Sequence, residues 1–425
     1  MQPLSSRPIW RPYTQEMTAP APIEIVNASG AYFHTKSGQR IFDGISSWWL
    51  ITHGHCHPEI VEAVQKQAAK LDQVTFANFT HGPAEELAEL LIEITPPDLT
   101  RVFFTDNGST AVEAALKMAI QACTQNGYPE KQKFLAFEAA YHGDTVGAMS
   151  VSGESPFNQP YRKTLFEVLR AKHPMLSNAS VEDYTRDFEA LIQEHHLCLA
   201  GVIIEPLIQG AGGMIVWPDA AVKRIAELCR EYNVYLIFDE VMTGFGRTGK
   251  LFAMDRLGVT PDFVCLSKGL TGGMLPLAVT LVREEIYRAF FSECKSRMFF
   301  HGHSFTGNPI SCAAAIANLK LFRNPSVLLN LELIEKVHRE QFADAKKNLP
   351  LVDTRVCGTV AAIEVNTQET GYLSDFSARV SLAALKEGLF IRPLGNVIYL
   401  LPAYCSTVAD LDTAWQILKW AVRNE

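Results

Sequence analysis

Short apolar runs alternate with segments of helical periodicity through the first three quarters of the chain. Continuously apolar or aromatic runs predict strands, and apolar residues at helical spacing predict helices. The strands are expected at 102–104, 134–137, 201–204, 235–238 and 263–266. The helices are expected at 58–71, 84–94, 110–123, 219–232 and 309–322. Because apolar strands that alternate with helices form parallel sheets covered on both faces, the expected fold class is α/β.

The pattern changes after Asn324-Pro325. An amphipathic segment then extends to Asn348, and shorter elements follow it. These are a strand at 360–365, a helix at 376–387, a strand at 397–401 and a helix at 409–422. This order predicts a smaller α+β domain over 325–425 behind a large domain over 51–324.

Composition narrows the class of protein. With 425 residues, 48% of them hydrophobic and 20% charged, the chain can bury a large core, which excludes disorder for most of it. The 38 basic against 46 acidic residues give a net charge of −8, so we expect no nucleic-acid partner. No long apolar stretch and no apolar leader within Met1–Met17 are present, and the nine cysteines are scattered singly. We therefore expect a cytoplasmic protein with reduced thiols and no membrane partner.

Polar residues follow the predicted strands. Lys268 and Asp239 come after two of them, and Tyr141 after a third. Gly108 and Ser109 follow a fourth strand and open a helix, where free amides suit a phosphate, although taken alone they favour an ordinary helix cap. The carboxyl ends of parallel strands meet at one edge of a sheet. A lysine, an acid, a phosphate site and an aromatic ring gathered there indicate pyridoxal phosphate.

Two other motifs are weaker. Residues 244–249 match G-x-G-x-x-G, which would suit a nucleotide-binding oxidoreductase, but no helix is expected within the glycines. The same segment fails as a P-loop because Leu251 stands where a magnesium-binding Ser or Thr is needed. His53, His55 and His57 alternate, yet no second ligand cluster accompanies them, so we expect no metal site.

Taken together, the motifs resemble the class III aminotransferases of the type I pyridoxal-phosphate fold. The resemblance extends nearly from end to end. It rests on residues 10–14, 43–49, 141–145, 204–206, 209–214, 239–240, 244–249, 268–273 and 391–393. Two of its elements, Pro12-Tyr13-Thr14 and Ser46-Ser47-Trp48-Trp49, resemble the branch of the family that acts in biotin synthesis.

The resemblance implies roles around the cofactor. Lys268 would bond to pyridoxal 5'-phosphate and Asp239 would keep the ring nitrogen protonated. Gly108 and Ser109 would bind the phosphate, and Tyr141 would cover one face of the ring. The catalytic residues implied are Lys268, Asp239 and Tyr13.

The resemblance also implies a substrate cleft and a partner subunit. Tyr13, Trp48 and Tyr141 would line the cleft, and Arg392 would pair with a carboxylate, which its planar guanidinium suits. Residues 1–50 would form an N-terminal segment that joins the small domain to the active site. The resemblance also places three residues near the cofactor of a partner subunit: Gly302, His303 and Ser304. It therefore implies a homodimer with shared active sites.

The activity implied is transfer of an amino group to 8-amino-7-oxononanoate, giving 7,8-diaminononanoate. S-adenosyl-L-methionine is the expected donor. Lysine stays open as an alternative donor, because His303-Ser304 stands where better-known relatives have Pro-Thr. An ω-aminotransferase for ornithine, 4-aminobutyrate or polyamines also stays open, as does a cofactor-binding scaffold without catalysis.

Overall fold

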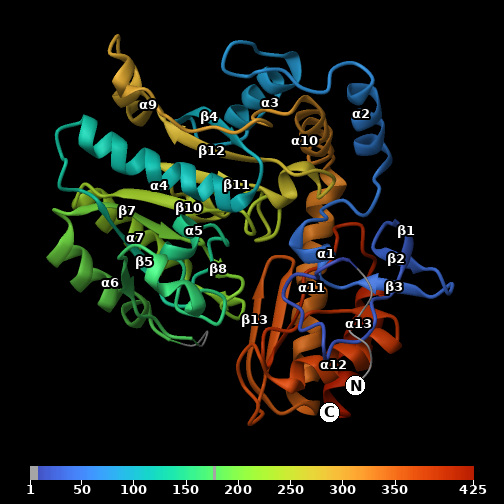
Figure 1. Cartoon of the computed structure of the whole chain (residues 1–425). Coiled ribbons are helices and arrows are strands. Elements are labelled where there is room, and N and C mark those ends of the chain that lie inside the picture. The colour runs from blue at the N-terminus through green and yellow to red at the C-terminus, as the bar shows by residue number, and fades with distance from the viewer. Residues whose placement is uncertain (1–7, 176–178) are drawn as a thin grey trace.

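A seven-stranded sheet forms the centre of the larger part of the molecule (Figure 1). The computed structural model describes residues 8–175 and 179–425, so the first seven residues of the expected N-terminal segment lie outside the described residues. Neighbouring strands are parallel except for one, which runs antiparallel to both of its neighbours. In spatial order the strands are β4 (Leu99–Thr105), the antiparallel β12 (Ala278–Arg283), β11 (Phe263–Leu266), β10 (Tyr235–Asp239), β7 (Leu199–Ile204), β5 (Lys133–Phe137) and β6 (Leu169–Ala171).

The apolar character of the strands follows from burial on both faces of this sheet. Along β10, Ile237 packs into one core, which it shares with α4 (Gly108–Gln125). Its neighbours Leu236 and Phe238 pack into the core on the opposite face, beneath α7 (Asp219–Glu231). Successive residues of a strand point to opposite faces, so a doubly covered strand must be apolar at every position. The expected α/β fold class with a mostly parallel sheet is confirmed.

The remaining elements of the first 324 residues surround this sheet. The predicted helices at 58–71, 84–94 and 309–322 are present with slightly different ends, whereas α6 and the strands β6 and β12 were not predicted. The elements around the sheet are α1 (Ser46–Trp49), α2 (Pro58–Ala68), α3 (Gly82–Glu93), α5 (Val146–Val151), α6 (Val181–His195), β8 (Ile208–Gln209), β9 (Ile215–Val216), α8 (Ala253–Leu257), α9 (Glu284–Phe290) and α10 (Pro309–Leu321).

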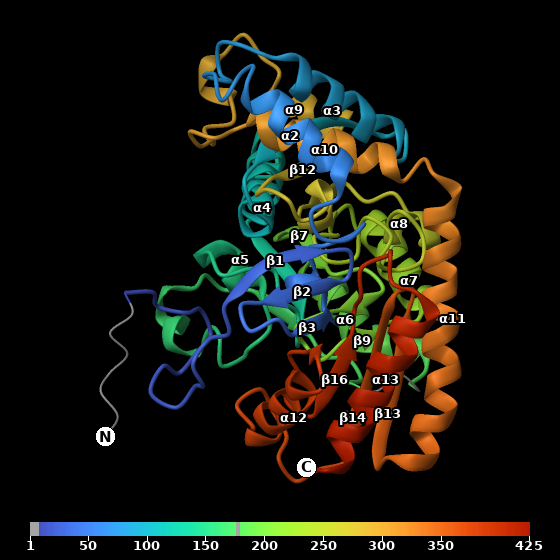
Figure 2. The same cartoon turned by 90° about the vertical axis from the view of Figure 1, so that its right-hand side faces the viewer.

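The C-terminal part forms an antiparallel sheet in the order β13-β14-β16, beside the long helix α11 (Figure 2). Its elements are α11 (Pro325–Asn348), β13 (Leu351–Cys357), β14 (Val360–Val365), α12 (Asp375–Lys386), β15 (Leu389–Phe390), β16 (Val397–Leu400) and α13 (Val408–Arg423). The apolar sides of these helices share one core with the strands. The predicted order of strands and helices is present, and the boundary at 324/325 stays a prediction.

The N-terminal segment is joined to the C-terminal part by β pairing. Strands β1 (Ile25–Ser29), β2 (Tyr32–Thr35) and β3 (Arg40–Asp43) form an antiparallel sheet, and β3 pairs in parallel with β15. Ala31 and Phe42 pack into the C-terminal core. Within the described residues, no helix combines the length and the apolar content needed to cross a bilayer.

Arg355 connects the C-terminal sheet to the larger part. Its side chain is 3% exposed and forms ion pairs with Asp353, at 2.9 Å, and with Glu364. It also donates hydrogen bonds to the carbonyl oxygens of Gly213, at 2.5 Å, and Met175, at 3.2 Å. The charge of this buried guanidinium is therefore balanced by two acids and oriented by two backbone groups.

We expect Arg355→Met to lower the free energy of unfolding by about 3–5 kcal/mol, because it leaves two carboxylates without their buried cation. Urea unfolding monitored by tryptophan fluorescence measures this change. Arg186→Met is the matched control, since Arg186 is 66% exposed and its ion pairs lie at the surface. Equal stability losses in the two variants would contradict the role of Arg355.

Candidate active site

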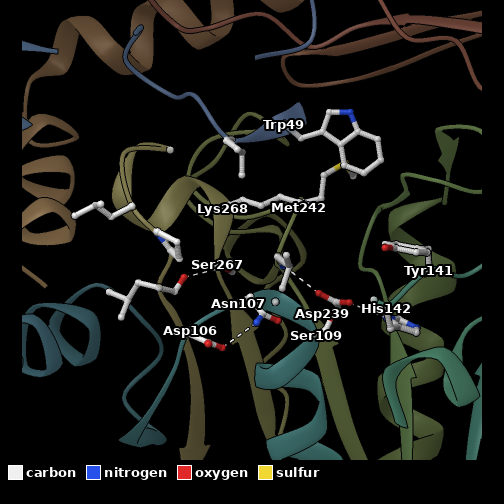
Figure 3. A pocket seen from close by; sticks show the side chains of 18 of the residues that line it. Trp49, Asp106, Asn107, Ser109, Tyr141, His142, Asp239, Met242, Ser267 and Lys268 are labelled. Atoms are coloured by element: carbon white, nitrogen blue, oxygen red, sulfur yellow. Dashed lines mark hydrogen bonds and ion pairs between the residues drawn. The ribbon is translucent and has the colours of Figure 1, made fainter. Parts of the chain in front are cut away.

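A cavity of about 430 Å³ opens at the carboxyl edge of the parallel strands (Figure 3). It is lined by residues from the ends of β4, β5, β7, β10 and β11. The structure brings together the five residues that the sequence assigned to one cofactor from separate strands: Gly108, Ser109, Tyr141, Asp239 and Lys268.

The N-terminus of α4 forms one end of the cavity. Asn107 caps the helix by accepting a hydrogen bond from the Thr110 amide at 3.1 Å. A Cβ atom on Gly108 would lie 2.6 Å from Val241 Cγ1, and one on Gly143 would lie 2.0 Å from Ser109 Oγ. These glycines allow the close approach of Val241 and of Ser109 at this end of the cavity. Gly108 and Ser109 line the cavity, so the amides of the first turn of α4 and the Ser109 hydroxyl can bind an anion there.

Asp239 lies at the end of β10 and is 4% exposed. One carboxylate oxygen accepts a hydrogen bond from the Val241 amide at 3.1 Å, and the other lies 2.7 Å from His142 Nδ1 (Figure 3). The two partners hold the acid in one orientation at the cavity wall. No motif of the strand ends pointed to His142 as its partner, although His142 follows Tyr141 directly.

Glu205 is a second buried acid in this wall and follows β7. Its carboxylate accepts hydrogen bonds from the amides of Tyr141 and Gly210, each at 2.9 Å. Burial raises the pKa of Glu205 to about 7, and the nearby His142 opposes this rise. Glu205 belongs to the Ile204-Glu205-Pro206 motif, but its position in the cavity wall was not predicted.

Lys268 follows β11 and adopts a left-handed backbone conformation, with φ at 44°. Its Nζ atom lies 4.7 Å from the centre of the Trp49 ring. Burial lowers the pKa of Lys268 to about 8, although Asp239 and Glu205 oppose this fall. More of this amine is therefore neutral near neutral pH than of an ordinary lysine, and the neutral amine is the nucleophilic form.

These groups fit pyridoxal phosphate. The first turn of α4 suits the phosphate, a fixed buried carboxylate suits the ring nitrogen, and an amine of lowered pKa suits the aldehyde carbon. The three requirements are met at one cavity by residues that are about 30 or more positions apart in the chain. The donor set therefore matches the cofactor.

A second cleft, of about 330 Å³, adjoins the first at Lys268 and Tyr141. Tyr13, Trp48 and Arg392 line it as well, so the structure brings the expected substrate residues together there. The Tyr13 hydroxyl donates a hydrogen bond to Asp144, and burial followed by this bond raises the pKa of Tyr13 to about 12. Asp144 belongs to the 141–145 motif, but its position in the cleft was not predicted. Sequence reasoning also missed cleft residues that lie outside any motif: Phe157, Tyr372, Leu394 and Tyr399.

Arg392 carries the positive charge of this cleft. Its guanidinium carbon lies 4.5 Å from the centre of the Trp48 ring, which holds the cation by a cation–π contact. Within residues 8–175 and 179–425 it forms no ion pair. Its charge can therefore be matched by an anionic ligand.

Gly302, His303 and Ser304 do not line either cavity of this chain. Gly302 and Ser304 are exposed, and both ring nitrogens of His303 lack a hydrogen-bond partner among the residues that the structure describes. Their expected position at the active site of a partner subunit stays a prediction.

The glycine-rich motif has a structural role. Arg247 of the glycine-rich segment is buried and donates hydrogen bonds to the carbonyl oxygens of Ile51 and Pro402. The next helix, α8, begins only at Ala253, so the strand-turn-helix arrangement of a dinucleotide site is not formed. Among the described parts of the chain, no group of three or more His, Cys, Asp or Glu residues is arranged to hold a metal ion.

Comparison with known proteins decides between the families that this site could suggest. The family model described as aminotransferase class-III matches residues 13–422. The chain belongs to this family. It is 45% identical to the adenosylmethionine-8-amino-7-oxononanoate aminotransferase of Synechococcus elongatus, over 95% of this chain and 96% of the relative. It is 41% identical to the protein of that name from Geobacter sulfurreducens, over 96% and 93% of the two chains.

Solved structures agree with this assignment to the class-III aminotransferases. The crystal structure of an adenosylmethionine-8-amino-7-oxononanoate aminotransferase from Methanocaldococcus jannaschii is 36% identical, with a TM-score of 0.92 over 98% of this chain and 97% of that one. A PLP-bound amine transaminase from an uncultivated Pseudomonas species is 29% identical, with a TM-score of 0.93 over 99% of each chain. The family and this PLP-bound relative imply pyridoxal phosphate as the cofactor.

We expect Lys268 of the cofactor-free protein to react with an amine acylating reagent at unusually low pH. Its labelling by acetic anhydride should rise with a midpoint near pH 8, because burial favours the neutral amine. Peptide mass spectrometry of one digest compares it with Lys336, whose side chain is 71% exposed. A Lys268 midpoint at the ordinary lysine value, about 10.4, would contradict the lowered pKa.

Proposed function

We propose that this class-III aminotransferase binds pyridoxal phosphate in the 430 Å³ cavity. Lys268 would bond to the cofactor, and Asp239 would face its ring nitrogen. Gly108 and Ser109 would bind the phosphate, and Tyr141 would cover the ring. The position of the first turn of α4 in the cavity lining and the fixed carboxylate of Asp239 support this assignment.

When bound, pyridoxal phosphate supplies a carbonyl carbon that takes up an amine and a ring that takes up electrons. The protein supplies the proton transfers. Once displaced, the Lys268 amine moves a proton between the substrate carbon and the adjoining cofactor carbon, a task that its lowered pKa suits. Asp239, held by His142, keeps a proton on the ring nitrogen because its carboxylate stabilises the positive charge there.

The acceptor that we propose is 8-amino-7-oxononanoate, with 7,8-diaminononanoate as the product in biotin synthesis. The observation that carries this proposal is Arg392, a cation that forms no ion pair with the described residues and shares an aromatic cleft with Lys268. The cleft suits a methylene chain, with the carboxylate at Arg392 and the oxo group at Lys268. The names of the relatives from Synechococcus elongatus and Geobacter sulfurreducens support the same substrate.

S-adenosyl-L-methionine is the amino donor that we propose, since the names of these relatives include adenosylmethionine. Lysine is the alternative donor. His303, which left the donor open in the sequence, lies outside the cleft of its own chain.

We also propose a cytoplasmic homodimer in which residues 302–304 complete the partner's site. Apolar side chains gather just before them in the chain, where Phe291 is 76% and Phe300 69% exposed. A groove lined by Phe290, Phe291 and Phe299 adjoins these residues. Exposed apolar surface of this kind is typical of an interface with another protein.

Separate half-reactions test the donor and the acceptor. The holoenzyme is mixed with S-adenosyl-L-methionine or with lysine, and the visible absorbance of the cofactor is recorded. We expect the first compound to bleach it and 8-amino-7-oxononanoate then to restore it. Restoration by 4-aminobutyrate-derived or ornithine-derived aldehydes, without any by the oxononanoate, would favour an ω-aminotransferase instead.

Two variants test the assigned roles. Lys268→Ala should abolish amino transfer, because it removes both the covalent link and the proton carrier.

Tyr13→Phe should slow amino transfer much more than it weakens retention of the cofactor, because its hydroxyl faces the substrate cleft. Turnover and bound cofactor are measured on the same samples, and unchanged kinetics of Tyr13→Phe would argue against its role at the substrate.

A further inference from the structure

Arg392 has a neighbour that no motif of the sequence indicated. Its Nη2 atom donates hydrogen bonds to the Tyr372 hydroxyl at 3.2 Å and to the Tyr13 carbonyl oxygen at 3.4 Å. Both protons of Nη2 are thus used, and no acceptor among the described residues contacts Nε or Nη1. The remaining donors of Arg392 are available to a ligand.

The Tyr372 hydroxyl is available to a ligand as well. It accepts the hydrogen bond from Arg392, and within the described residues it donates none. A phenolic hydroxyl can accept and donate at the same time. Because the side chain lines the substrate cleft next to Arg392, its proton can be directed at an anion that Arg392 binds.

The Tyr372 ring is fixed by its surroundings. It contacts Phe157 edge to face, with the ring centres 4.6 Å apart. Tyr372 and Phe157 both line the substrate cleft and also a neighbouring cavity of about 310 Å³, so the pair lies at the boundary between the two. The ring therefore holds its hydroxyl at the end of the cleft.

The backbone joins Tyr372 to the segment that carries Arg392. A Cβ atom on Gly395 would lie 2.7 Å from the carbonyl carbon of Gly371, so the two glycines allow a close backbone contact. Ser377 Oγ also donates a hydrogen bond to the Gly395 carbonyl oxygen at 2.6 Å. Gly395, in the turn after Arg392, thus contacts the chain both before Tyr372, at Gly371, and after it, at Ser377.

We propose that Tyr372 is a second carboxylate-binding residue, which positions Arg392 and donates its own hydrogen bond to the substrate carboxylate. This inference rests on the proposed function only in naming 8-amino-7-oxononanoate as the acid. Tyr372 thereby makes the enzyme select acceptors that end in a carboxylate over neutral analogues of the same length.

The test compares 8-amino-7-oxononanoate with its methyl ester in wild-type and Tyr372→Phe holoenzymes. The substitution removes only the hydroxyl and keeps the contact with Phe157. We expect KM for the acid to rise about tenfold to hundredfold with little change in kcat, since a charge-assisted hydrogen bond is lost from ground state and transition state alike. The kinetics of the ester should not change.

Two further variants sharpen the result. Tyr128→Phe is the matched control, because Tyr128 is 44% exposed and lies outside all of these cavities. Arg392→Lys should also lose the preference for the acid, and adding Tyr372→Phe to it should cost less than the two changes separately, since both act on one carboxylate. If Tyr372→Phe leaves the ratio of kcat/KM for the acid to kcat/KM for the ester at its wild-type value, the inference is overturned.

Binding of octanoate to the holoenzyme separates this inference from the proposed function. Calorimetry should show weaker binding of octanoate, but not of octanamide, in Tyr372→Phe. If the wild-type enzyme does not use 8-amino-7-oxononanoate while this difference persists, the proposed substrate is wrong and the role of Tyr372 stands. Equal octanoate affinity in the wild type and Tyr372→Phe would overturn the role of Tyr372.

Discussion

The parallel pairing of β10 with β11 is the constraint on which the site depends. It sets Asp239 opposite Cys265, and Lys268 follows three residues later at the same edge of the sheet. A register shift by one residue would turn the Asp239 side chain to the other face. The close-packed cores on both faces of the sheet oppose such a shift, because each buried side chain would have to fit a space that its neighbour fills. The cofactor site is therefore positioned by ordinary strand packing.

Within that frame, backbone amides allow buried acids to surround the lysine. Glu205 accepts two amide hydrogen bonds, and Asp239 accepts one beside its contact with His142. Their negative charge opposes, without cancelling, the burial that lowers the pKa of Lys268. The environment thus favours a reactive amine near neutral pH while keeping a carboxylate ready for a ring nitrogen.

The sequence predicted those parts of the site that follow from strand periodicity. Apolar runs located the strands, and the polar residue after each run gave the lining of the cofactor cavity. His142 and Glu205 could not be paired with their neighbours in this way, because pairing depends on which strands are adjacent. Tyr372 lies in a loop without periodicity or motif, so its contact with Arg392 arises only from the way the chain folds. Strand β12 was missed although its apolar run resembles the others, because it follows a glycine-rich turn.

The reversed direction of β12 has a consequence for how this enzyme can vary. Since β12 runs against β11, the chain that leaves β11 with Lys268 must re-enter the sheet at the same edge, and residues 273–277 line the cavity on the way. Extra residues inserted there would change the wall of the space for the cofactor. Length changes should thus be tolerated far less in this connection than in loops that do not line the cavity.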